Sequence, residues 1–232
     1  MKRLSDPWGI CIYVVTLAAF IIVSLLGNRA VTVFSENLAQ PKCVIIDAGH
    51  GGIDSGAVSC TGVYESNINL QIALKLRDLM HLLGIKTIMI RDTDCSIDTE
   101  GNTIAAKKIS DIKERIRIIN TTPNAILISI HQNHFQDQRY SGAQAFYNSI
   151  EQSKVLAEKI QSDLRSNLDP GNKRKVKKIS GVYLMERINA PGVLIECGFL
   201  SNPSEEAKLR DNQYQNKICS VISTTLSQYL NT

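Results

Sequence analysis

Residues 44–57, VIIDAGHGGIDSGA, decide the fold: a short apolar run breaks abruptly into a histidine set among glycines and aspartates. The apolar, β-branched start has the pattern of a buried strand. The glycines that follow permit positive φ angles and a close approach of the backbone to a ligand. A histidine that only packs in a core does not need this freedom. The stretch therefore predicts a strand that delivers His50 to a functional site.

The composition is that of one globular domain. The chain has 232 residues, of which 44% are hydrophobic and 21% charged, so it is neither disordered nor fibrous. A net charge of +4 is far from the basic balance of a typical nucleic-acid binder, and no nucleic-acid partner is predicted. The cysteines include no C-x-x-C pair, so we expect free thiols, with a bridge between Cys60 and Cys95 left open.

The N-terminal region carries a membrane signal. After a basic start, residues 8–27 form an uncharged and almost wholly apolar run. Its length approaches the roughly 20 residues of a bilayer-spanning helix, so we expect a transmembrane anchor over residues 1–28, with a cleaved signal peptide as the alternative. The positive charges of Lys2 and Arg3 predict a cytoplasmic N-terminus and a catalytic domain, residues 43–232, on the outer side of the membrane. Residues 29–42 form the expected linker.

The remaining chain alternates short β-branched runs with longer helical patterns. Because helices between successive strands require crossover connections, this order predicts an α/β fold with a mostly parallel sheet and helices on both faces. Strands are expected at residues 43–47, 85–90, 125–131, 143–147 and 192–197, and helices at residues 65–83, 110–120, 153–168, 204–209 and 211–230.

Three candidate site residues lie at strand ends. His50 follows the first strand, His131 ends the third and Glu196 almost ends the last. In open parallel sheets, ligands bind beyond the carboxyl ends of the strands, so these side chains are expected to meet. A hydrolytic zinc site takes three ligands from His, Asp and Glu. Glu65, which opens the first helix, is the acidic candidate; its alternative role is to complement the helix dipole.

Five motifs follow one another along the chain: IIDAGHGGIDSGA at residues 45–57, ESNIN at 65–69, RDTD at 91–94, ISIHQN at 128–133 and PGVLIECGFLSNPSE at 191–205. In their order they resemble the zinc-dependent N-acetylmuramoyl-L-alanine amidases of the type 3 family, over nearly all of residues 43–230. The resemblance implies a twisted sheet of about six strands, Zn²⁺ held by His50, Glu65 and His131, and Glu196 as the catalytic carboxylate.

The family implies a function as well. Its members cleave the peptidoglycan amide bond between N-acetylmuramic acid and the L-alanine of the stem peptide, using a water molecule activated by zinc. The plan of an anchor and one catalytic domain most resembles the sporulation amidases that prepare spore cortex for muramic-lactam formation. Two alternatives stay open: a membrane-tethered protein that binds peptidoglycan without cutting it, and a zinc peptidase acting within the stem peptide.

Further expectations concern partners and supporting residues. Residues 132–141 leave no room for the inhibitory helical insertion found in some family members, so we expect a separate regulatory protein to restrain or position the enzyme. The basic run at residues 172–178 is expected to be a solvated loop, or else a contact with anionic wall polymer. Asp47 and Asn133 are expected to orient the imidazoles, because they lie close to the ligands in sequence.

Overall fold

The computed structural model describes residues 16–17 and 42–231, and residues 42–231 belong to one compact unit. The predicted anchor, residues 1–28, and the predicted linker, residues 29–42, lie outside the described residues except at positions 16, 17 and 42. In the part of the chain that is described, no helix has the length and hydropathy needed to cross a membrane.

Six strands form a single mixed sheet in the order β2-β1-β3-β6-β4-β5. Neighbouring strands are parallel, except that β4 is antiparallel to β6. The predicted α/β class with a mostly parallel sheet is therefore confirmed. The strands are β1 (Cys43–Ala48), β2 (Thr87–Met89), β3 (Ala125–Asn133), β4 (Gln144–Tyr147), β5 (Lys177–Lys178) and β6 (Gly192–Phe199).

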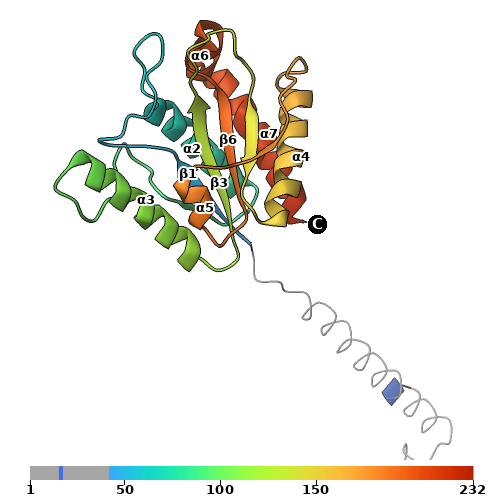
Figure 1. Ribbon diagram of the computed structural model, residues 1–232. Helices are drawn as coiled ribbons and strands as arrows, with labels where there is room; N and C mark the ends of the chain where they lie inside the picture. Colours follow the sequence, from blue (N-terminus) through green and yellow to red (C-terminus); the bar gives the residue numbers. More distant parts are fainter. Residues whose placement is uncertain (1–15, 18–41, 232) are drawn as a thin grey trace, which may run out of the picture. The chain divides into compact units, whose positions relative to one another are not determined.

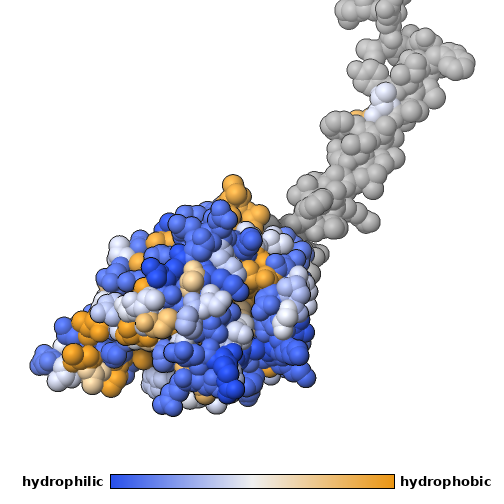
Figure 2. All heavy atoms as spheres, turned by 90° about the horizontal axis from the view of Figure 1, so that it is seen from above, coloured by the Kyte–Doolittle hydropathy of each residue, from blue (hydrophilic) through white to orange (hydrophobic). Residues whose placement is uncertain are grey.

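Helices cover both faces of the sheet, as predicted (Figure 1). One face packs against α2, α4 and α7, and the other against α3 and α5, while α6 precedes α7 and packs beside β6. The face seen in Figure 2 is largely hydrophilic, with hydrophobic side chains gathered in a few patches. The helices are α2 (Glu65–Leu82), α3 (Ile104–Thr121), α4 (Glu151–Asn167), α5 (Tyr183–Arg187), α6 (Pro203–Arg210) and α7 (Asn212–Leu230).

Strand β1 shows how one strand supplies two different cores. All six of its residues are buried. Val44 and Ile46 belong to the larger apolar cluster, with α2, α4 and α7, whereas Ile45 belongs to the smaller cluster, with α3 and α5. Successive side chains of a strand point to opposite faces, so Asp47 lies on the same face as Ile45. The smaller core therefore lies beside the buried carboxylate of Asp47.

Three elements differ from the sequence-based expectation. Helix α3 begins at Ile104, six residues before the expected start, because the Thr103 hydroxyl accepts a hydrogen bond from the Ala106 amide and caps the helix. Helix α5 was not expected. Strand β5 forms within the basic run that was expected to be a solvated loop; its two lysines are exposed, and charged residues at a sheet edge discourage pairing with another chain.

Candidate metal centre

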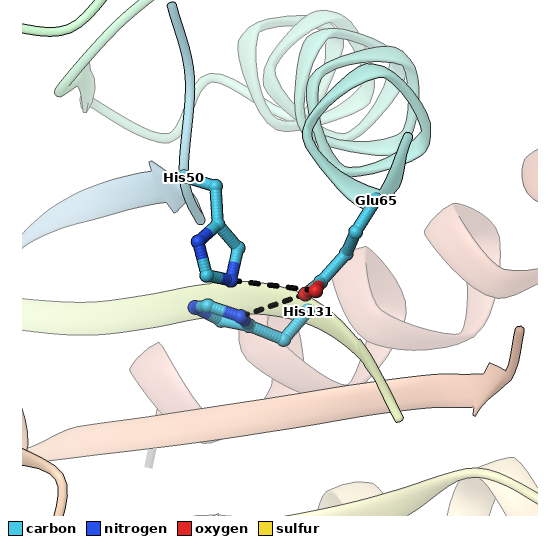
Figure 3. A group of neighbouring side chains, drawn as sticks. All are labelled: His50, Glu65 and His131. Carbon is cyan, nitrogen blue, oxygen red and sulfur yellow. Dashed lines mark hydrogen bonds and ion pairs between the residues drawn. The ribbon is translucent and has the colours of Figure 1, made fainter. Parts of the chain in front are cut away.

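Three side chains converge at the carboxyl ends of β1 and β3 (Figure 3). His50 follows β1, His131 lies in β3, and Glu65 is the first residue of α2. The Nε2 atom of His50 is 3.3 Å from one carboxylate oxygen of Glu65, and the Nδ1 atom of His131 is 3.0 Å from the other. Their potential ligand atoms all lie within 4.8 Å of one another. The structure thus brings together the three residues that the sequence nominates as zinc ligands.

The Glu65 carboxylate is held by hydrogen bonds as well as by the imidazoles. It accepts from the backbone amides of Ala57, at 2.9 Å, and Gln132, at 3.1 Å, and from the Asn69 side chain, at 3.2 Å. Burial opposes its charged form, but the hydrogen bonds with His131 and the other imidazole hold the pKa of Glu65 well below its ordinary value. Glu65 is therefore a fixed anion.

Two glycines give the site its close packing. A Cβ atom at Gly49 would lie 2.2 Å from the His131 ring, and one at Gly56 would lie 2.6 Å from a carboxylate oxygen of Glu65. His50 itself has a φ angle of 62°, in the left-handed region that few non-glycine residues adopt. The glycines of the opening motif predicted a close approach of the backbone to a functional site. The groups that the backbone approaches at Gly49 and Gly56 are the side chains of two candidate ligands.

Asp54 orients the first histidine. Its carboxylate lies 2.7 Å from Nδ1 of His50, and the Lys108 ammonium group lies 2.7 Å from its other oxygen. Burial disfavours an imidazolium, but the hydrogen bonds with Asp54 and Glu65 raise the pKa of His50 to about 9. Surroundings that stabilise a positive charge on this ring also favour a cation beside it. Sequence reasoning missed Asp54, although it lies within the opening motif, four residues after His50.

Asp47 supports the loop rather than an imidazole. Its carboxylate pairs with the guanidinium group of Arg115 and accepts from the Ser129 hydroxyl at 2.7 Å. Arg115 in turn donates to the backbone carbonyl of His50 at 2.9 Å. The backbone carbonyl of Asn133 accepts a hydrogen bond from the backbone amide of Leu200. The expected contact of Asp47 with an imidazole is therefore wrong, because its carboxylate instead pairs with the guanidinium group of Arg115 on α3.

Arg91 joins the two segments that carry His50 and Glu65. Its buried guanidinium group donates to the carbonyl of Ala48, the last residue of β1, at 2.8 Å, and to the carbonyl of Gly49, which follows β1, at 3.0 Å. It also donates to the carbonyl of Ser66, at 2.9 Å, in the first turn of α2. Sequence reasoning used residues 91–94 only as part of a motif, because no local pattern indicates a bond between residues so far apart.

Glu196 lies beside the three candidate ligands. In the register of the sheet it is the partner of His131 on β3 and of Gln144 on β4. Its Oε2 atom is buried and, within the described residues, has no hydrogen-bond partner. Burial raises the pKa of Glu196 to about 7; the His131 imidazole opposes this shift, and the Glu65 carboxylate adds to it. Such a carboxyl group can take up and release a proton near neutral pH.

The donor set fits zinc. Two imidazole nitrogens and one carboxylate oxygen are the combination that holds catalytic zinc while leaving a position open for water. The Asp54 carboxylate on the far nitrogen of His50 is the outer contact that such sites usually contain. The other described histidines lie apart from the group. His81 is exposed on α2, where its Nε2 atom forms a hydrogen bond with the Thr87 hydroxyl, and His134 is exposed in the loop after β3.

The five described cysteines are all free. Cys43, Cys197 and Cys219 are buried, as expected of cysteines that pack as small apolar residues. Cys60 is exposed and Cys95 partly exposed, and the bridge between them that the sequence left open is not formed.

A mostly parallel sheet with a His-Glu-His group at its carboxyl edge and a partly buried carboxyl group alongside fits a metal-dependent hydrolase. The family model for N-acetylmuramoyl-L-alanine amidases, Amidase_3, matches residues 44–228, and the chain belongs to this family. It is therefore an amidase of the cell wall.

Similar proteins agree with this assignment. The germination-specific N-acetylmuramoyl-L-alanine amidase of Bacillus subtilis is 39% identical over 190 residues, which cover 81% of this chain and 79% of that protein. The CwlD amidase from Clostridioides difficile, solved in complex with the GerS lipoprotein, is 42% identical, with a TM-score of 0.79, over 82% of this chain and 98% of that one. An N-acetylmuramoyl-L-alanine amidase from Clostridium difficile 630 is 31% identical, with a TM-score of 0.73, over 84% of this chain and 99% of that one.

Proposed function

We propose that the chain hydrolyses the amide bond between N-acetylmuramic acid and the L-alanine of the stem peptide, with Zn²⁺ held by His50, Glu65 and His131. The observation that carries this proposal is the grouping of three ligand atoms within 4.8 Å, next to the buried carboxyl group of Glu196. When bound, zinc supplies the polarisation of the scissile carbonyl and a lowered pKa of the attacking water.

The chain's own residues supply the proton transfer and the positioning. Glu196 accepts the proton of the attacking water at its carboxylate and donates it to the departing nitrogen of L-alanine. A pKa near 7 suits both steps, because the group must be deprotonated before attack and acidic afterwards. Asp54 holds the ring orientation of His50, and Arg91 holds the His50 loop against the start of α2. Neither Asp54 nor Arg91 needs to touch the substrate.

Digestion of purified peptidoglycan tests the reaction. Mass spectrometry of the products should show intact stem peptides with a new L-alanine amino terminus. Shortened peptides would instead indicate the zinc peptidase, and unchanged material a binding protein. Elemental analysis of the folded protein should find one zinc ion per chain, and the conservative change Glu196→Gln should keep the metal and lose the turnover.

A role in the spore cortex is the finer proposal. It is supported by the similarity to the germination-specific amidase of Bacillus subtilis. Removal of stem peptides exposes the lactyl carboxyl groups from which muramic lactam forms. Spores whose only copy of this protein carries Glu196→Gln should therefore contain cortex without muramic lactam, as measured by muropeptide chromatography. Normal muramic lactam in those spores would contradict the cortex role.

The anchor and the partner complete the proposal. Residues 1–28 tether the catalytic domain on the outer side of the membrane, as the apolar run and its basic start favour. Deletion of residues 1–28 should move the protein from the membrane fraction to the soluble fraction. A separate protein positions or restrains the enzyme; the lipoprotein bound to the Clostridioides difficile amidase supports this idea. Activity of purified residues 43–232 equal to that in cell extracts would count against such a partner.

A further inference from the structure

A cavity of about 180 Å³ opens beside the candidate ligands, on the face of the sheet covered by α3 and α5. His50 and His131 form part of its wall, so the cavity is continuous with the site of the reaction. Much of the remaining wall is apolar and comes from the His50 loop, α3, α5 with its cap, and β6. These apolar residues are Ile53, Ile112, Val182, Tyr183, Leu184 and Leu194.

Almost every charged side chain in the wall has a partner of opposite charge. The Lys108 ammonium group lies 2.7 Å from the carboxylate of Asp54. Arg115 pairs with both Asp47 and Asp111. The two histidines face the carboxylate of Glu65, as described above. Each of these groups already has a partner within the protein, and Arg115 is shared by two carboxylates, so neither Lys108 nor Arg115 is free to bind an anionic ligand.

Lys107 is the exception among the described residues that line the cavity. It lies on α3, is half-buried, and forms no ion pair or hydrogen bond through its ammonium group within residues 42–231. The cavity therefore presents apolar side chains and, among the described residues, one ammonium group without an ion-pair partner. A ligand that fits both features has a small apolar group and, a short distance away, an anion.

The glycan side and the peptide side of the scissile amide differ in whether they combine an apolar group with a nearby anion. On the glycan side, the sugar carries hydroxyl groups that lose hydrogen bonds with water when they are buried against apolar side chains. On the peptide side, the first side chain is the methyl group of L-alanine, and the following residues of the stem carry free carboxylates. Only the peptide side combines an apolar group with a free carboxylate, so the peptide side matches the wall and its ammonium group.

We propose that this cavity binds the stem peptide and that Lys107 pairs with the first free carboxylate beyond L-alanine. The inference rests on the proposed function, because it assumes that the amide to be cleaved lies at His50, Glu65 and His131. Lys107 is then a specificity-determining residue that favours peptides with a carboxylate at this position over peptides in which it is amidated.

Two N-acetylmuramoyl tripeptides test this proposal with the zinc-loaded, full-length protein. They differ only in whether the α-carboxyl group of the second residue is a carboxylate or a carboxamide. A hydrogen-bonded charge pair predicts a KM roughly tenfold lower for the carboxylate, with a similar kcat. Lys107→Met should abolish the difference by raising KM for the carboxylate alone, and Lys107→Arg should retain it. Lys113→Met is the matched control, because Lys113 is exposed on α3 outside the cavity wall.

Direct binding gives a second measurement. Calorimetry of the Glu196→Gln protein with the two tripeptides should show the same roughly tenfold preference for the carboxylate, and it should disappear when Lys107→Met is added. Equal KM values for both tripeptides in the wild type, or an equal loss for both in Lys107→Met, would overturn the peptide subsite and leave the amidase function intact. A wild type that frees no peptide from either compound or from peptidoglycan would refute the proposed function, and this inference with it.

Discussion

The same strands form both faces of the sheet, but one face is mainly apolar and the other carries polar groups of the candidate site. On the face covered by α2, α4 and α7, β1, β3 and β6 contribute mainly apolar side chains, such as the fully buried Ile46, Ile128 and Ile195. On the face covered by α3 and α5, the same strands carry Asp47, Ser129, His131 and Glu196. The alternation of side chains along a strand lets one face stabilise the fold while the other holds the chemistry.

The polar face tolerates burial because most of its groups are paired. Burying a charge is costly unless it is paired and hydrogen-bonded, and Asp47 has both Arg115 and Ser129 as partners. Glu196 is different, because one of its carboxylate oxygens is buried without a partner among the described residues. An unsatisfied group next to three potential metal ligands is best explained by a role in the reaction.

The largest effect is expected from Glu196→Gln on the polar face. Removal of the proton acceptor should lower kcat about 10²- to 10⁴-fold. The amide is almost the same size as the carboxyl group and carries no charge, so the free energy of unfolding should not fall. The release of new amino termini from peptidoglycan and a denaturant titration measure the two quantities. A variant that keeps wild-type kcat would remove Glu196 from the mechanism.

The apolar face should show the opposite behaviour. Leu76 on α2 is fully buried in the larger cluster, and Leu76→Ala should reduce the free energy of unfolding by about 2–5 kcal/mol through lost contacts and a residual cavity. The kcat of the folded fraction should stay close to that of the wild type. Leu82→Ala, at a side chain that is 82% exposed near the end of the same helix, is the control, with an expected change within about 0.5 kcal/mol. Similar losses in both variants would contradict the assignment of Leu76 to the core.

The difference between the faces also explains what could be predicted from the sequence. His50, His131 and Glu196 follow or end strands with strong apolar signals, and the ends of parallel strands meet at one edge, so their grouping could be inferred. The roles of Arg91 and Arg115 could not, because each reaches backbone carbonyls more than 40 residues away in sequence, and no local periodicity records such a bond.

Short elements were missed for another reason. Helix α5 has five residues and β5 has two. A hydrophobic period needs a window of about 11 residues or more for a helix and four or more for a strand. Both elements depend on tertiary contacts: Leu184 and Met185 of α5 are buried in the smaller core, and β5 pairs with β4. The part of the cavity wall that α5 supplies could therefore not be predicted from the sequence.

The orientation of the first histidine should have a moderate effect. Asp54→Asn leaves the side chain the same size but removes the negative charge beside the Nδ1 atom of His50. We expect zinc affinity to fall about 10- to 100-fold, as for other changes in groups that hold a metal-binding histidine. Competition with a chromogenic chelator measures the affinity, and Asp78→Asn, at an exposed position of α2, is the control. An unchanged affinity in Asp54→Asn would mean that the ring is held by its backbone alone.

The smallest effect is a pH dependence of stability that comes from the polar face. Burial alone would raise the pKa of Asp47, but Arg115, with smaller contributions from His131 and Ser129, holds it below its ordinary value. The charged carboxylate is therefore favoured in the folded protein, and its contribution to the free energy of unfolding is complete above the ordinary aspartate pKa of about 4. It is lost as the pH falls through the lower pKa of the folded state. In metal-free protein, the stability advantage of the wild type over Asp47→Asn should shrink progressively below about pH 5. A constant difference over this range in denaturant titrations would show that the contact with Arg115 stabilises the loop whether or not Asp47 is charged.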